Sequence, residues 1–469
     1  MKVILAGIIL FHFTYKISLG NEIRDSLKDN SDSSSVLESL LIDKIIIAGN
    51  DKTDEEIILR EMSVKSDSRL NLKMLEKDAE KIYKLGLFNK VDIIPMQSAK
   101  AGKINIMILV EERFYFLPIP QCGFRNGEFS KFWAGLNLIW NNFRGRNETV
   151  ALNFGIGYEP FIRLNYSVPW IGEKAHFFSS VSADYSKTYN RSLQALNDTT
   201  SSSIPSGDQN FVNYNFKVSY ILGKYLNDNL SVSSELAYRL VKLSQYEPGR
   251  TVSNDGKDNY MTFALSSKYD TRNSIEYTLS GLYVSLSYVK YGFGKLFDFN
   301  KIYFDSKVFI PVKIKGNYSI TVASYFNTAV SFGGTIPAYL NEFYGYDKII
   351  RGYKKIVSEG ENRTGVFNEI RIPIIEPYYI KGGSIPVAKK IGVLKNLNYR
   401  FGLYSTVFFD IGGVWNKSDN FFKTEFRKGF GTGLNFILPF GITGRTDLAF
   451  RREDKRFIPQ VIFDLSASF

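Results

Sequence analysis

The side chains that most often carry enzyme chemistry are scarce in this chain of 469 residues. Its two histidines are His12 and His176, and its one cysteine is Cys122, so neither a histidine-based triad nor a histidine or cysteine metal cluster can be assembled. The glycine-rich run 429–433 lies in an alternating strand pattern and opens no helix, which argues against a phosphate-binding loop. No Gly-x-Ser-x-Gly nucleophile segment precedes residue 115. The sequence therefore predicts a protein that is not an enzyme and uses neither a metal nor a cofactor.

The composition favours a membrane β-barrel over a bundle of membrane helices. Mean hydropathy is -0.14, and beyond the N-terminus no run approaches the roughly 20 apolar residues that a spanning helix needs. Aromatic residues are frequent, at 15%, as girdles at both membrane interfaces require. The net charge of +12 is scattered through loops, so a solvated surface beside anionic lipid headgroups explains it better than a nucleic-acid site.

Two segments are expected to precede the folded part. A positive start at Met1-Lys2, an apolar stretch over 3–13 and small residues at 18–20 predict a signal peptide over residues 1–20. Residues 21–41 are rich in Ser, Asp and Asn, which predicts a disordered linker.

Residues 42–114 have the pattern of a small α+β domain. A short apolar strand over 42–49 precedes Thr53 and Glu56, whose spacing predicts a capping box at a helix start. A second helix is expected over 71–85, followed by strands at 90–94 and 104–110. This order, together with Leu85-Gly86-Leu87-Phe88, resembles a POTRA domain; a generic α+β domain is the alternative. A POTRA-like sheet has an edge that can accept an extended polypeptide of any sequence.

Residues 115–469 alternate between apolar and polar side chains, which predicts a transmembrane barrel of about 16 antiparallel strands. The last strand carries Phe463, Leu465 and the terminal Phe469 on one face, as a terminal strand signal. The expected strands lie near 118–124, 132–140, 149–157, 161–168, 175–185, 212–220, 230–239, 260–269, 282–291, 302–310, 318–330, 365–374, 399–409, 429–438, 444–451 and 459–469.

Two regions leave the strand assignment open. The long connection 375–398 falls on the side where turns should be short, so it is either an elaborated turn or a sign of a wrong count. Pro118 and Pro120, in a first strand that also contains Gly123, lack amide donors. That strand would pair poorly with the last one and form a gate; alternatively, the prolines belong to a linker before the barrel.

Five motifs in order resemble the BamA/TamA outer-membrane insertase superfamily, the bacterial surface-antigen barrels that follow POTRA domains. The turn Asn141–Arg146 has Arg where the family has its first glycine, and Asn273 replaces an Asp. The chain also has one POTRA-like domain where better-known relatives have several. The motifs are 141–146, 168–172, 269–273, the sixth-loop segment 336–353 with Ile350-Arg351-Gly352-Tyr353, and the strand Phe408-Phe409-Asp410-Ile411-Gly412.

The resemblance implies where Arg351 finds its partner. A guanidinium inside a polar barrel needs an anion, because a lone buried charge is costly. In the family the loop Arg meets the Asp of the Phe-x-Asp-x-Gly strand, so we expect Arg351 to pair with Asp410, with Glu369 as a second acceptor. Gly352 would allow the tight turn and Tyr353 would pack on the barrel wall. The alternative is an Arg-Gly-Tyr segment in a solvated loop.

The function implied is that of an assembly factor in the bacterial outer membrane, with its POTRA-like domain in the periplasm. It would fold and insert β-barrel proteins by templating their strands at a lateral gate. Its partners would be unfolded outer-membrane proteins and the lipid bilayer, with periplasmic chaperones or lipoproteins as further candidates, and no nucleic acid. A two-partner-type secretion pore is the alternative, and a passive porin or adhesin is a third possibility that the POTRA-like domain disfavours.

Overall fold

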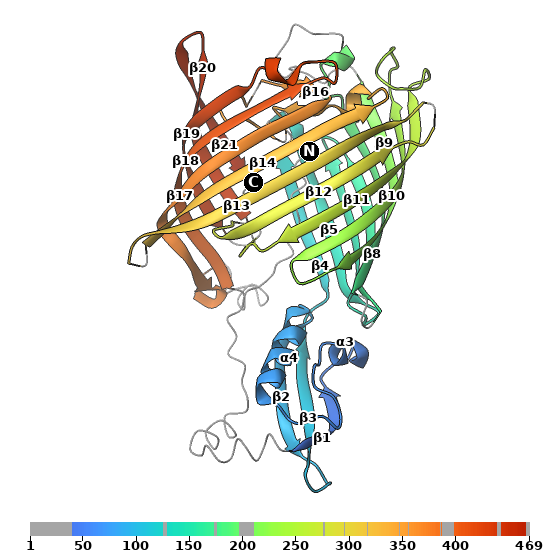
Figure 1. Ribbon diagram of the computed structural model, residues 1–469, viewed down its shortest axis with the longest axis vertical. Coiled ribbons are helices and arrows are strands. Elements are labelled where there is room, and N and C mark those ends of the chain that lie inside the picture. Colours follow the sequence, from blue (N-terminus) through green and yellow to red (C-terminus); the bar gives the residue numbers. More distant parts are fainter. Residues whose placement is uncertain are drawn as a thin grey trace.

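The computed structural model describes residues 40–124, 129–172, 176–196, 211–274, 277–294, 296–316, 318–346, 348–354, 356–384, 386, 398–438 and 442–465. Within them, a small domain lies beneath a wall of slanted strands (Figure 1). No helix in this part of the chain is long and apolar enough to span a membrane. The expected signal peptide, most of the expected linker and Phe469 lie outside the described residues.

The small domain is an α+β unit with the predicted order of elements. β3 is its central strand, parallel to β1 and antiparallel to β2. Asn71 caps the start of helix α4, and its side chain accepts a hydrogen bond from the backbone N–H of Met74 at 3.1 Å. Leu75 and Ile82 of α4 share one buried core with Ile106 of β3. The elements are β1 (Leu41–Ala48), α3 (Glu55–Leu59), α4 (Leu72–Lys84), β2 (Phe88–Gln97) and β3 (Lys103–Glu112).

Sixteen strands form one antiparallel sheet that curls into a barrel (Figure 1), which confirms the predicted fold class and strand number. The loop between β14 and β17 contains its own two-stranded sheet of β15 (Glu342–Tyr344) and β16 (Ser358–Gly360). The barrel strands are β4 (Phe116–Phe124), β5 (Phe132–Phe143), β6 (Glu148–Gly157), β7 (Phe161–Ile171), β8 (Phe177–Tyr189), β9 (Val212–Tyr225), β10 (Leu230–Leu243), β11 (Lys257–Asp270), β12 (Gly281–Tyr291), β13 (Phe299–Lys315), β14 (Tyr318–Gly333), β17 (Asn362–Lys381), β18 (Asn398–Trp415), β19 (Arg427–Leu438), β20 (Ile442–Glu453) and β21 (Arg456–Leu465).

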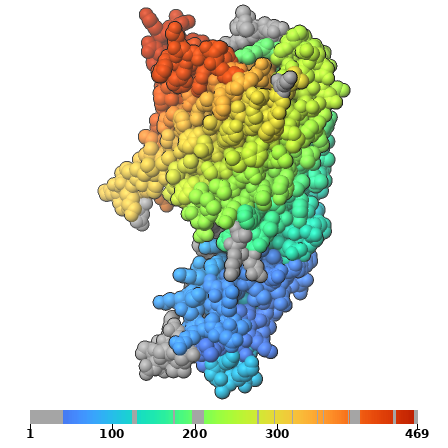
Figure 2. All heavy atoms as spheres, turned by 45° about the vertical axis from the view of Figure 1, so that its right-hand side comes forward, coloured from blue at the N-terminus to red at the C-terminus, as the bar shows by residue number. Residues whose placement is uncertain are grey.

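The barrel is apolar outside and polar inside. Leu265 and Val407 are 51% and 50% exposed on the outer wall, whereas Asn327, Asp410 and Asp447 are buried. In water this arrangement would be unfavourable, because apolar surface is exposed and charge is buried. In a bilayer it is the expected arrangement of a membrane barrel. Figure 2 shows the closely packed outer face of the wall directly above the small domain.

The first part of the long connection 375–398 is strand. β17 continues to Lys381, which pairs with Asn398 at the start of β18. Register shifts near Pro373 and Ile375 accommodate the prolines of this stretch within the ladder. The strand count is therefore correct, and the elaborated connection is shorter than its sequence suggested.

The first barrel strand contains both prolines. Pro118 pairs with Leu138 and Pro120 with Leu136 in the β4–β5 ladder, so the alternative that they form a linker is wrong. Gly123, in the same strand, pairs with Trp133. Within the described residues the ladder ends at β4 on one side and at β21 on the other, and no pairing joins these two edges.

Polar contacts fix the small domain beneath the β5–β6 turn. The capping box predicted at Thr53 and Glu56 is wrong: α3 has Asp54 at its N-cap, with no side-chain cap. The Thr53 hydroxyl instead accepts a hydrogen bond from the Asn142 side-chain amide at 2.8 Å. The Asp54 amide donates to the Gly145 carbonyl at 2.9 Å. The local pattern failed because Thr53 has partners distant in sequence.

Candidate functional site

The loop between β14 and β17 folds back into the barrel and anchors there. Tyr344 and Ile350 are each 1% exposed and share a core cluster with Tyr325 of β14 and Phe367 of β17. Gly352 turns the chain with a φ of 97°, a conformation that favours glycine. The aromatic and aliphatic packing thus positions the residue between Ile350 and Gly352, which is Arg351.

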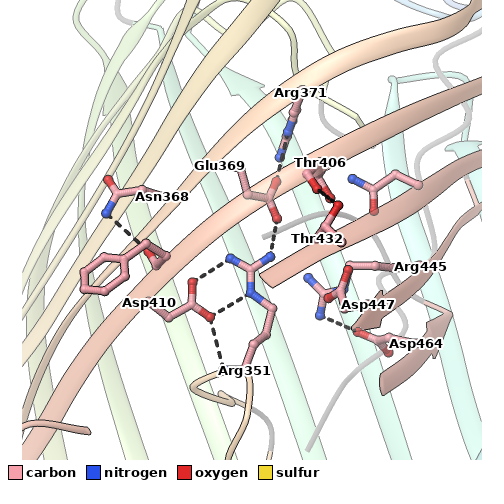
Figure 3. A network of polar contacts seen from close by, with 12 residues as sticks. Arg351, Asn368, Glu369, Arg371, Thr406, Asp410, Thr432, Arg445, Asp447 and Asp464 are labelled. Carbon is pink, nitrogen blue, oxygen red and sulfur yellow. Dashed lines mark hydrogen bonds and ion pairs between the residues drawn. The ribbon is translucent and has the colours of Figure 1, made fainter. Parts of the chain in front are cut away.

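Arg351 is held by two carboxylates from adjacent strands (Figure 3). Its Nε and Nη2 donate to the two oxygens of Asp410 at 2.7 and 2.5 Å, a forked arrangement. Its Nη1 donates to Glu369 at 2.6 Å, and its backbone N–H donates to Asp410 at 3.0 Å. The structure therefore brings together the three residues that the sequence had associated.

Arg351, Asp410 and Glu369 form a buried anchor for the loop, and further ion pairs balance its charges. Arg351, Asp410 and Glu369 are 2%, 0% and 3% exposed. The second oxygen of Glu369 accepts from Nε of Arg371 at 3.1 Å. The Arg351 guanidinium lies 3.7 Å from the centre of the Phe408 ring, which adds a cation–π contact. With water excluded, each charge here depends on its partners.

A second group of charges lies beside the anchor on β20 and β21 (Figure 3). Arg445 pairs with the fully buried Asp447 at 3.1 Å and with Asp464 of β21 at 3.4 Å. The charged residues of β17 and β20 occur two apart, Glu369 with Arg371 and Arg445 with Asp447. Residues two apart face the same side of a strand, so this spacing was an overlooked sequence signal for an inward polar cluster.

Glycine allows the loop to approach the wall of the barrel. A Cβ at Gly429 of β19 would overlap the backbone carbonyl of Arg351. A Cβ at Gly412 of β18 would come within 2.8 Å of the Tyr344 ring. The glycines of these two strands thus provide the space in which the loop backbone lies, a role that their alternating pattern alone did not predict.

The loop also reaches the last two strands. Nη1 of Arg451 in β20 donates to the Gly352 carbonyl at 3.0 Å. The Lys354 amide donates to Oε1 of Gln460 in β21 at 2.9 Å. Tyr353 packs between loop and wall, with the Arg451 guanidinium 5.7 Å from its ring centre. Contacts from residues 350–354 therefore extend from β17 to β21.

The remaining site candidates lie apart from the anchor. Pro118, Pro120 and Gly123 are in β4, at the opposite edge of the sheet from β21. Phe463 is 68% exposed on the outer face of β21, and Leu465 ends that strand. Among the described residues, no group of three or more His, Cys, Asp or Glu side chains could hold a metal ion.

Comparison with family models decides the affiliation. The model of the Omp85 superfamily domain matches residues 142–469. The chain belongs to the Omp85 superfamily. A second model, POTRA, described as a surface antigen variable number repeat, matches residues 40–113. The resemblance to BamA-type barrels with a POTRA domain is thereby confirmed.

Curated relatives and solved structures agree with this family. The chain is 30% identical over 125 residues to the chloroplastic outer envelope protein 80 of Oryza sativa, covering 26% of this chain and 19% of the relative. It is 19% identical over 185 residues to the outer membrane protein assembly factor BamA of Nitratidesulfovibrio vulgaris, covering 39% and 23% of the two chains. The matches thus span only about a fifth of the length of these relatives.

Two solved structures share the fold. BamA from Haemophilus ducreyi lacking POTRA domains 1–3 has a TM-score of 0.65 at 16% identity, covering 91% of this chain and 84% of that one. CdiB from Escherichia coli has a TM-score of 0.59 at 12% identity, covering 91% and 75%. Superfamily membership points to an outer membrane with the POTRA domain in the periplasm.

Proposed function

We propose that this Omp85 protein is an assembly factor of the bacterial outer membrane that folds and inserts client β-barrel proteins. The observation that carries the proposal is the pair of sheet edges, β4 and β21, that no described pairing joins. An unpaired strand edge is a template for another strand. The POTRA domain leads directly into β4, since β3 ends at Glu112 and β4 begins at Phe116.

The proposed mechanism needs no covalent chemistry. An unfolded outer-membrane protein is received as an extended strand at the edge of the POTRA sheet. The terminal strand of this client then pairs with the free edge of β4. The bilayer beside the seam, which is the gap between the edges of β4 and β21, receives the growing client barrel. The anchored loop with Arg351, Asp410 and Glu369 keeps the C-terminal strands of the barrel folded while the seam opens. Periplasmic chaperones or lipoproteins would act as delivery partners.

The test is client insertion by the full chain in liposomes. A urea-unfolded small outer-membrane barrel is added, and its acquisition of a protease-resistant fold is timed with and without the protein. We expect clear acceleration over empty liposomes. If a well-folded protein gives none, the insertase proposal fails, and a secretion pore for a dedicated exported partner becomes the better account.

The native cysteine allows an internal control. Cys122 lies in β4, so single cysteines at Phe457, Val461 or Phe463 of β21 can each be tested for a disulfide across the seam. The oxidised protein should not insert the client, and reduction of the same sample should restore insertion. Full activity of the locked protein would rule out a mechanism through this seam.

A further inference from the structure

The hydrogen-bonding direction of β4 can be determined from its ladder with β5. In an antiparallel pair, opposed residues alternate between those that exchange backbone hydrogen bonds and those whose N–H and C=O point to the other side. The Asn141 amide donates to the carbonyl of Tyr115, directly opposite, at 2.8 Å. Tyr115 and every second residue after it therefore bond to β5. Pro118 and Pro120 are among the alternate residues, which point into the seam.

The far end of the ladder gives the same result independently. The Tyr158 amide donates to the Phe132 carbonyl at 2.9 Å, so this pair bonds between β5 and β6. The next residue, Trp133, consequently directs its backbone groups toward β4, where its partner is Gly123. Gly123 thus belongs to the set that bonds to β5, as counting from Tyr115 requires.

The same alternation can be followed on β21. Glu453 and Arg456 pair across a two-residue turn whose residues, Asp454 and Lys455, have φ of 46° and 68°. Such a turn is of the kind that closes tight hairpins, and its flanking pair is hydrogen-bonded. Arg456 and every second residue after it bond to β20. Pro459 falls between them, so its nitrogen faces the seam.

Both edges of the seam are therefore short of donors. A proline nitrogen carries no hydrogen, so three of the ten seam-facing positions present a carbonyl without an amide. All three proline side chains are exposed on the outer face of the wall. The seam-facing positions are Phe116, Pro118, Pro120, Cys122 and Phe124 on β4, and Phe457, Pro459, Val461, Phe463 and Leu465 on β21.

We propose that Pro118, Pro120 and Pro459 weaken closure of the seam, so that a client strand can replace it. The proposal rests on the proposed insertase function. Each missing amide removes one hydrogen bond that a closed β4–β21 ladder could form, whereas every carbonyl of β4 stays available to a client's amides. Pro459 affects closure alone when the client pairs with β4. Pro118 and Pro120 weaken both closure and the client's final hold on β4, which favours release.

The experiment compares full-length proteins in liposomes. The variants replace a proline by valine and so add a backbone amide at a chosen position. Pro459→Val and the pair Pro118→Val with Pro120→Val restore seam donors with side chains suited to a lipid-facing strand. Pro311→Val is the matched control, because Pro311 is also exposed but lies in β13, paired with Thr321. Closure is measured as the temperature at which the barrel loses its compact migration in gels. Insertion and release of an unfolded small barrel are timed on the same samples.

We expect Pro459→Val to raise the closure temperature and to slow insertion about fivefold, as one added hydrogen bond implies. The double variant should raise that temperature further and also delay release of the client, while Pro311→Val changes neither quantity. If a variant does not fold, Pro118→Val and Pro120→Val are tested singly.

Two results would overturn the proposal. Closure temperatures equal to that of the control would mean that the prolines do not limit closure. Raised temperatures with unchanged insertion would mean that the prolines only protect the edges from aggregation. If the unmodified protein inserts no client, the proposed function fails, but the closure temperature still shows whether the prolines weaken the seam.

Discussion

Replacing Arg351 by alanine removes the only cation that contacts both Asp410 and Glu369 in the described part of the structure. Asp410 would keep no ion pair there, and Glu369 would keep Arg371. Removing one partner of a buried ion pair costs about 3–5 kcal/mol, because the other charge is stranded. That cost falls on the docked loop, so the population of the docked loop relative to the undocked loop should fall by about two to four orders of magnitude.

Hydrogen exchange of the loop amides in liposomes measures this equilibrium directly. The Arg351 backbone amide, which donates to Asp410 at 3.0 Å, should lose its protection together with its neighbours. Arg163→Ala is the control, since its pair with Asp184 involves side chains that are 38% and 22% exposed and should contribute less than about 1 kcal/mol. Unchanged exchange around residue 351 would refute the reasoning. Adding Asp410→Asn to Arg351→Ala should recover part of the loss, because it removes the stranded charge.

Two further predictions concern the wall and the POTRA domain. Gly429→Ala should displace the loop, because the new Cβ would meet the Arg351 carbonyl. Hydrogen exchange of the loop amides measures this displacement. Gly294→Ala is the control and should have no effect, because the space around its Cβ is open. A hydrogen bond from Lys100 holds the pKa of the Asp43 carboxyl below its ordinary value of 3.8. Its stabilising contribution is therefore complete above that value and lost as the pH falls through the lower folded pKa. Urea-dependent proteolysis at pH 5 and pH 3 measures how much stability the POTRA domain loses between these two pH values. Asp43→Asn should reduce that loss.

Most of the fold could be predicted because a barrel strand has a local signature. Alternation over about ten residues depends on each strand's own two faces, so strands such as β9 and β10 could be located without knowing their neighbours. Local signals failed where partners are distant. Thr53 has the spacing of a helix cap, but its hydroxyl lies against Asn142, 89 positions away. Pro118 allowed both strand and linker, because its sequence does not tell which side its nitrogen faces.

The anchor shows the same division. Arg351 and Asp410 were associated through a family resemblance, since nothing in either segment specifies contact across 59 positions. The contribution of Gly429 could not be predicted, because it depends on the place where a loop backbone meets a strand. Residues two apart on one strand, such as Arg445 and Asp447, did carry a usable signal, namely charge repeated on an inward face.

The anchor and the seam meet on β21, which has a ladder with β20 on one side only among the described strands. The loop also supports β21, through the hydrogen bond from the Lys354 amide to Gln460 at 2.9 Å. Because Arg351 fixes the same loop to β17 and β18, loosening the anchor removes support from β21, whereas an added amide at Pro459 strengthens its closure. The two perturbations should therefore act in opposite directions on the seam. If the seam moves a client strand into the bilayer, the anchored loop determines how far β21 can yield without the barrel unfolding.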